Sequence, residues 1–156
     1  RHTRLHHEYR RLADEIAKRA GLAPGLSASR LLSRIMGESP DYAGAAAELA
    51  ITAFPGDVGG DVANVNRWRG QIQLPPLPDA EATRSVTRFD YNSLKIGFVE
   101  MAGTSGGQPT RITGAIVPFQ GATWFFKLLG PDALVAKEKA AFLEFLKTIK
   151  PPAPTP

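Results

Sequence analysis

The chain has 156 residues, 43% hydrophobic and 22% charged, as expected of one soluble globular domain with extensions, and no apolar run approaches the ~20 residues of a membrane span. It contains no cysteine, which excludes disulfides, thiolate metal sites and cysteine nucleophiles. The formal charge is +4, but residues 1–21 hold six Lys/Arg against three Asp/Glu, so the remaining body is close to neutral and lacks the basic face of a nucleic-acid-binding domain.

Residues 1–21 are predicted to form an amphipathic helix that ends at Gly21, followed by a linker to residue 30. The apolar positions recur at four- and three-residue steps, at Leu5, Tyr9, Leu12 and Ile16. We interpret the basic side chains of this helix as a solvated face rather than a nucleic-acid site. The chain begins at Arg1 rather than Met, which is consistent with the removal of a leader or a lipid anchor.

The chain offers little chemistry for catalysis. Its three histidines, His2, His6 and His7, lie near the start, where no outer hydrogen bonds would fix them as metal ligands, so no metal and no cofactor are expected. The body after Gly21 has neither His nor Cys, which excludes a Ser-His-Asp catalytic triad and the commonest general base there. We therefore expect no catalytic residues and no enzyme.

Two strands are expected before the centre of the chain. Residues 31–36 read as a short strand, and the turn-rich residues 37–44 follow. In residues 46–54, Leu49, Ile51 and Ala53 alternate with Ala50, Thr52 and Phe54, as in a central strand or a buried edge strand. The alanines at the start of this segment would also permit a helix.

The most unusual stretch runs over residues 54–77. Pro55 and Gly56 break the preceding apolar run, and a Gly59-Gly60 turn then leads to Asp61, a carboxylate suited to an N-cap or first helical turn. The helix that follows has a core-facing set of side chains, Val62, Val65, Trp68 and Ile72. A second, polar face is predicted from Asn64, Arg67 and Gln71.

This stretch has two interpretations. A Gly-Gly turn that opens a helix presents backbone N–H groups to a phosphate or carboxylate, although the spacing is not that of a P-loop and Asp57 and Asp61 would repel an anion. Alternatively, the polar side chains bind nearby loop carbonyls and carboxylates and fasten the helix, while the two aspartates cap it. The candidate ligand- or partner-binding residues are Asn64, Asn66, Arg67, Trp68, Arg69 and Gln71.

Beyond this helix the pattern changes to strands. Residues 74–78 are extended because of their prolines, and residues 79–86 are predicted to form a short helix capped by Asp79. Strands are then predicted at residues 87–91, 94–101, 111–117 and 123–129, separated by turn residues at 92–93, 103–107 and 120–121. Such short links favour antiparallel pairing.

The last predicted element is one helix over residues 131–150, with an apolar face and a solvated face. The apolar face comprises Leu134, Val135, Phe142, Phe145, Leu146 and Ile149, and the solvated face Lys137, Glu138, Lys139, Glu144 and Lys147. Trp124 and Phe126 point to one face of the sheet and Phe125 and Lys127 to the other, so both faces need cover. The prediction is an α+β fold, a mainly antiparallel sheet with helices on both faces over residues 31–150, and a polyproline-like tail at 151–156.

The run GDVGGDVANVNRWRGQ resembles the signature of an uncharacterised bacterial family of envelope proteins, often lipoproteins, with a PsbP-like α/β/α sandwich. The resemblance extends over about residues 31–149, through GAIVP at 114–118, TWFFKLLG at 123–130 and the last helix. It implies the bacterial cell envelope, on the periplasmic side, and brings no established activity.

Two functions follow from these features. The first is a non-enzymatic accessory subunit that docks on a larger, membrane-associated protein complex through its last helix, its Pro-rich tail and exposed residues such as Trp68 between Arg67 and Arg69. The alternative is a small-molecule or anion-binding module that uses the Gly59-Gly60 turn and the following helix. It predicts a concave polar pocket beside that turn, with arginines that are not paired with internal carboxylates. Nucleic-acid binding by the N-terminal helix is disfavoured.

Overall fold

The computed structural model describes residues 29–36, 46–119, 121–147 and 149. The predicted N-terminal helix with its histidines, the turn-rich residues 37–44 and the Pro-rich tail lie outside the described residues. So do the predicted linker, up to residue 28, and the end of the last predicted helix at residue 150.

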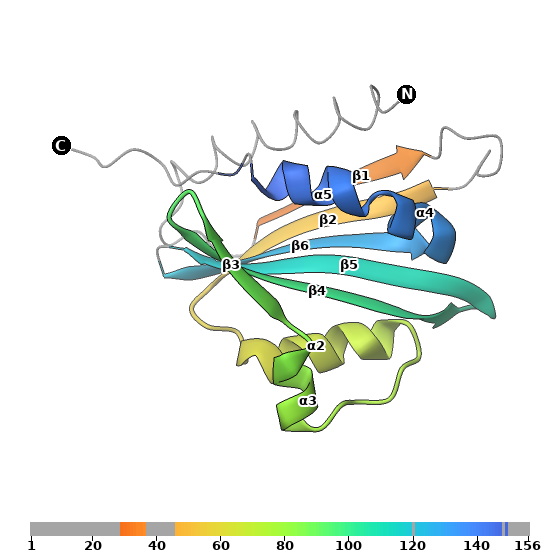
Figure 1. Cartoon of the computed structure of the whole chain (residues 1–156), viewed down its shortest axis with the longest axis horizontal. Coiled ribbons are helices and arrows are strands. Elements are labelled where there is room, and N and C mark those ends of the chain that lie inside the picture. Colours follow the sequence, from red (N-terminus) through yellow and green to blue (C-terminus); the bar gives the residue numbers. More distant parts are fainter. Residues whose placement is uncertain (1–28, 37–45, 120, 148, 150–156) are drawn as a thin grey trace.

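The described strands form one antiparallel sheet with the order β1-β2-β6-β5-β4-β3 (Figure 1). The strands are β1 (Ser29–Met36), β2 (Ala46–Pro55), β3 (Thr87–Tyr91), β4 (Leu94–Ser105), β5 (Gln108–Phe119) and β6 (Ala122–Pro131). The helices are α2 (Gly60–Gln71), α3 (Asp79–Arg84), α4 (Asp132–Lys137) and α5 (Lys139–Leu146). The α+β class with a mainly antiparallel sheet is confirmed. None of the described helices is long and apolar enough to cross a membrane.

The strands from β3 to β6 follow the predicted hairpin order. The β3–β4 turn consists of Asn92 and Ser93, both at positive φ, 52° and 65°, as a two-residue hairpin turn requires. The β4–β5 turn is shorter than predicted: Gly106 and Gly107 alone make it, and Gly103 to Ser105 belong to β4. The β5–β6 link is also tight, so these strands run longer than their predicted cores.

Alternate side chains of the central strands enter two separate hydrophobic clusters. Phe98, Val117 and Phe126 belong to the first, and their chain neighbours Val99, Ile116 and Phe125 to the second. The first cluster includes residues of α4 and α5, and the second includes residues of α2 and α3. In Figure 1 these helix pairs accordingly lie on opposite sides of the sheet.

Helix α2 is seated on the sheet by Trp68. A Cβ placed on Gly114 of β5 would lie 2.3 Å from Cζ3 of the Trp68 ring, so only glycine lets the indole reach the strand. At the other end, Gly103 leaves room for the chain after α2, where Thr104 donates its N–H to the Ile72 carbonyl at 2.9 Å. α2 therefore lies over β4 and β5.

The predicted cap of α3 needs correction. Pro78, not Asp79, occupies the N-cap, and no side chain caps the helix. Asp79 lies in the first turn, where the helix dipole still favours its carboxylate. The helix also ends at Arg84 rather than at residue 86.

The last predicted helix is wrong as a single element. It is interrupted at Glu138, whose ψ of 4° is not helical, and α4 and α5 run in different directions in Figure 1. Glu138, which was predicted on the solvated face, is 2% exposed. The interruption allows both segments to bury their apolar side chains against the sheet, from Leu134 and Val135 in α4 to Phe142, Phe145 and Leu146 in α5.

Candidate functional site: a basic groove beside α2

The glycine turn before α2 is held by the residues around it. Gly59 occupies the N-cap position in the left-handed region, with φ 90°, and Gly60 follows at φ 75°. The carboxylate of Asp57 accepts the Gly60 N–H at 3.1 Å, and Asp61 forms an ion pair with Arg88 of β3. Both aspartates therefore stabilise the turn and the helix start, as the structural interpretation of this stretch predicts.

Two of the candidate site residues fasten the Pro-rich segment that follows α2. The Asn66 amide accepts the Leu77 N–H at 2.8 Å and donates to the Leu77 carbonyl at 3.1 Å. Arg69 donates its Nε–H to the Pro75 carbonyl at 2.8 Å. Both side chains are hydrogen-bonded to backbone groups, so Asn66 and Arg69 fasten the helix to the following segment, as the second interpretation of this stretch predicts.

Asn64, which was predicted on the polar face of the helix with Arg67 and Gln71, is buried, with 1% of its surface exposed. Its amide nitrogen donates to the Gly60 carbonyl at 2.7 Å, and its amide oxygen accepts a hydrogen bond from Nη1 of Arg67 at 2.5 Å. Burial is tolerated because both ends of the amide have partners. Asn64 therefore links the glycine turn to Arg67.

Trp68 lies in the core, as its place among the apolar positions predicts. It is 2% exposed, and its ring meets Phe125 edge-on at a centroid distance of 6.0 Å. A side chain this buried cannot serve as an exposed docking residue, which corrects that part of the accessory-subunit hypothesis.

A groove of about 480 Å³ runs beside α2, over the part of the sheet formed by β2 and β6. It is lined by Ala50, Thr52 and Phe54 of β2, Phe125 and Lys127 of β6, Val58, and Arg67, Trp68 and Gln71 of α2. The Lys127 ammonium donates to Oε1 of Gln71 at 2.7 Å across the groove. Among the described residues that line it, two are basic and none is acidic.

Arg67 is the central charge of this groove. Its guanidinium carbon lies 5.1 Å from the Phe125 ring centroid and 5.9 Å from that of Trp68, within the range of cation–π contacts. Burial lowers the pKa of Arg67, yet an arginine stays cationic at physiological pH. Within the described part of the chain, Arg67 forms no ion pair with a carboxylate; its hydrogen-bond partner is the Asn64 amide.

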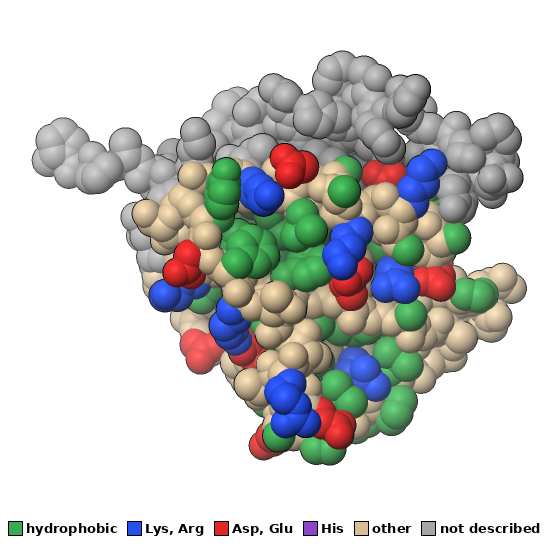
Figure 2. Space-filling view, in the orientation of Figure 1, with side chains coloured by type: hydrophobic (Ala, Val, Ile, Leu, Met, Phe, Trp, Pro, Cys, Tyr) green, Lys and Arg blue, Asp and Glu red, His purple; other side chains and the backbone are tan. Residues whose placement is uncertain are grey.

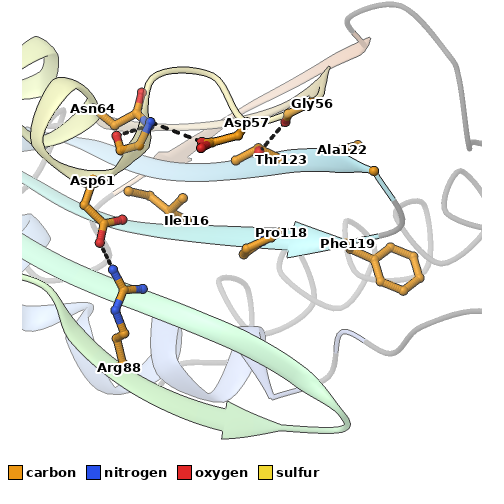
Figure 3. Close-up of a pocket in the computed structure, with 12 residues that line it drawn as sticks. Gly56, Asp57, Asp61, Asn64, Arg88, Ile116, Pro118, Phe119, Ala122 and Thr123 are labelled. Atoms are coloured by element: carbon orange, nitrogen blue, oxygen red, sulfur yellow. Dashed lines mark hydrogen bonds and ion pairs between the residues drawn. The ribbon is translucent and has the colours of Figure 1, made fainter.

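A second cavity, of about 690 Å³, lies beside the glycine turn (Figure 3). Its walls include Asp57, Asp61 and Asn64, together with Arg88 and Thr123. These polar groups bind one another or the turn; Thr123, for example, donates its hydroxyl to the Gly56 carbonyl at 2.7 Å. The described residues that line this cavity include two carboxylates and one guanidinium, which is an excess of negative charge.

The sequence pattern predicts the α2 side of the groove but not the strand residues of its floor. Arg67, Trp68 and Gln71 were candidates, whereas Thr52, Phe125 and Lys127 were read only as strand residues. The strand alternation placed Phe125 and Lys127 on one face, and that was the available signal. Which strand lies beside β6, and which helix overhangs it, depends on long-range pairing. No group of three or more His, Cys, Asp or Glu that could hold a metal ion occurs among the described residues.

Comparisons with known proteins bear on the fold alone. No family model matches the chain, and no curated protein matches it significantly. A solved structure of a Pseudomonas aeruginosa protein of unknown function, PA94, is similar with a TM-score of 0.51 and 15% identity, over 83% of this chain and 87% of that one. A protein from Bacteroides thetaiotaomicron matches with a TM-score of 0.40 and 15% identity, over 74% of this chain and 42% of that one.

Proposed function

We propose that this protein is a non-enzymatic binding module that receives an anionic group in the groove beside α2. The observation that carries the proposal is Arg67, an exposed cation that lines the groove, lies against two aromatic rings and has no carboxylate partner among the described residues. The proposed binding site is therefore at the helix after the Gly59-Gly60 turn rather than in the turn itself.

Arg67 holds its positive charge beside the rings of Trp68 and Phe125. Removing a cation from water costs free energy unless a counter-ion or hydrogen bonds replace the water. Arg67 remains exposed, and the neutral Asn64 amide and the two ring faces replace only the water that its guanidinium has lost. A carboxylate or phosphate in the groove would supply charge-assisted hydrogen bonds and a counter-charge, and Lys127 adds a second cation.

The other cavity is less suited to an anion. Among the described residues that line it, Asp57 and Asp61 are acidic, and the one cation, Arg88, is already paired with Asp61. An anion there would meet uncompensated negative charge, which disfavours binding. The groove beside α2 is therefore the better candidate, although the cavity at the glycine turn is larger.

The finer assignments of fold and family belong to the same proposal. The two helix pairs on either side of the antiparallel sheet support a PsbP-like α/β/α sandwich with helices on both faces. Membership of the bacterial envelope family, and a place on the periplasmic side, are proposed from the GDVGGDVANVNRWRGQ resemblance. The non-enzymatic character is proposed because the body after Gly21 has no His or Cys.

The test is a titration of the full chain with inorganic phosphate, in which two-dimensional NMR spectra of the backbone amides report binding. The variant Arg67→Gln removes the groove cation, and Arg69→Gln is the matched control because Arg69 binds the Pro75 carbonyl instead. Loss of a charged hydrogen-bond partner should weaken binding about 10- to 100-fold in Arg67→Gln. Arg69→Gln should stay within twofold of the wild type. Equal affinity in all three proteins, with both variants folded by circular dichroism, would overturn the proposal.

A second candidate is the accessory subunit that docks on a larger, membrane-associated complex. It is favoured by Tyr91, a large apolar side chain that is 42% exposed on the edge strand β3. Figure 2 shows apolar side chains gathered on this face of the molecule between α5 and β3, surrounded by charges of both signs. Native mass spectrometry of gently isolated material tests it: a stoichiometric larger assembly would support the subunit role, and a bare monomer would count against it.

A further inference from the structure

We infer that the ligand of the groove is a small amphiphilic anion, with an acidic head bound by Arg67 and Lys127 and an apolar portion that lies toward Phe54 and Val58. The inference rests on the proposed function and specifies its ligand class. It follows from the way polarity changes along the groove.

The floor of the groove has a fixed order. In the pairing of β2 with β6, Ala50 is opposite Lys127 and Thr52 is opposite Phe125. Side chains two residues apart on one face of a strand are separated by about 7 Å, so the floor has successive levels along the strand direction. The small side chains at positions 50 and 52 leave the space open at the first two levels.

One end of the groove is basic and polar. The Lys127 ammonium and Gln71 lie at the level of Ala50, since Lys127 pairs with Ala50 and binds Oε1 of Gln71 at 2.7 Å. Arg67 lies at the next level, because its guanidinium is 5.1 Å from the Phe125 ring, which is opposite Thr52. The two cations are therefore on adjacent levels, within reach of one acidic head.

The opposite end is apolar. The Phe54 ring lies 6.1 Å from the Phe125 ring, and both line the groove with Val58. Val58 is 36% exposed, one of the two large hydrophobic residues that the described part of the chain leaves exposed. An apolar chain laid here would remove these surfaces from water, which is favourable in proportion to the area covered.

Size and charge agree with such a ligand. A groove of about 480 Å³ lies within the range of sites that hold small molecules. An ion without an apolar part would leave the Phe54 end wet, and a neutral apolar molecule would leave Arg67 without a counter-charge. An alkyl carboxylate or alkyl phosphate satisfies both ends.

The experiment is a titration of the full chain with acetate, butanoate, hexanoate and octanoate at constant ionic strength, with hexanol as the neutral analogue and inorganic phosphate as the head group alone. Affinity should rise about fourfold for each methylene that leaves water, until the chain outgrows the groove. Hexanol should bind at least tenfold more weakly than hexanoate. The variant Arg67→Gln should lower the affinity for every carboxylate by a similar factor.

Two further variants separate the apolar end from the head group. Val58→Ser should lower the affinity for hexanoate several-fold and leave the affinity for phosphate unchanged. Tyr91→Ser, at the other exposed large hydrophobic residue of the described part of the chain, should change neither affinity. Phosphate and acetate binding without any gain on chain extension would overturn this inference and leave the proposed function intact. Absence of binding by every anion would overturn the proposed function itself. Binding of a short acetylated Asp/Glu peptide, but of no alkyl carboxylate, would also overturn the inference.

Discussion

Gly114 and Trp68 show how closely one residue fixes the position of α2. An added Cβ at Gly114 would lie 2.3 Å from the Trp68 ring, so Gly114→Ala should displace the indole and lower the free energy of unfolding by about 1–3 kcal/mol. Gly70→Ala is the control, because no atom lies within 4 Å of its added Cβ and Ala favours a helix over Gly by about 1 kcal/mol. Urea unfolding followed by circular dichroism should therefore give changes of opposite sign, and a neutral Gly114→Ala would contradict this packing.

Asn64 determines whether Arg67 is available to a ligand. The substitution Asn64→Asp would place a carboxylate beside the guanidinium, because the Asn64 amide oxygen already accepts its Nη1–H. Arg67 would then be paired with the new carboxylate. The variant should bind hexanoate about tenfold more weakly, since this internal ion pair competes with the ligand. Asn66→Asp makes the same chemical change at a residue that binds Leu77 and should leave the affinity of the folded protein unchanged. Wild-type affinity in Asn64→Asp would contradict the role given to Arg67.

The sequence predicts the apolar residues of this region better than the polar ones. Val65, Trp68 and Ile72 are buried where the helical spacing places them. Asn64 was predicted on the polar face of α2 and Glu138 on a solvated face, and both are buried. Polar side chains can be buried when local partners satisfy them, and such partners are set by tertiary contacts that a periodicity argument does not contain.

At the scale of elements, the Pro-rich segment after α2 is held by the Asn66 side chain. The amide takes both the N–H and the carbonyl of Leu77, in the manner of a backbone pair. Asn66→Ala leaves these part-buried groups without that partner and should lower the free energy of unfolding by about 1–3 kcal/mol, with faster hydrogen exchange at Leu77. Glu144→Ala, which removes an exposed ion pair with Lys147, should change stability by less than about 1 kcal/mol. Equal effects of the two variants would contradict the fastening role.

The strands and α2 could be predicted from period and turn chemistry, whereas the interruption of the last helix could not. Residues 87–91 form β3 as expected, and the turn at Asn92-Ser93 carries an explicit local signal. Residues 132–146 have good helical propensity throughout, and no Gly or Pro marks a break at Glu138. The break lets two apolar sets meet the sheet, so its cause lies in packing rather than in the local sequence.

At the scale of the whole molecule, the two hydrophobic clusters share the same strands and should unfold together. Trp68 belongs to one cluster and Trp124 to the other, and the chain has no further tryptophan. The variants Trp68→Phe and Trp124→Phe each leave one fluorescent reporter. In each variant, the urea midpoint seen by fluorescence should coincide with the midpoint seen by far-UV circular dichroism. Fluorescence and circular dichroism midpoints that differ within either variant would show that the two sides of the sheet unfold separately.

The order of the sheet was beyond prediction from sequence. Short links identify the neighbours from β3 to β6, but β2 reaches β6 only after the chain has passed through α2, α3 and three strands. That pairing creates the floor of the groove, with Thr52 opposite Phe125. The helix residues of the candidate site were therefore accessible from local patterns, and the strand residues that complete it were not.

The most direct test of ligand binding in the groove beside α2 is ¹⁵N NMR of the arginine side chains during a titration with hexanoate. If hexanoate binds there, the Nε–H resonance of Arg67 should shift with saturation, while that of Arg69, hydrogen-bonded to the Pro75 carbonyl, should stay in place. Backbone amides at Val58 and Gln71 should shift along the same binding curve, because both residues line the groove. Shifts confined to Arg88 and the glycine turn would place the ligand in the other cavity, and no shift at any arginine would contradict the binding function.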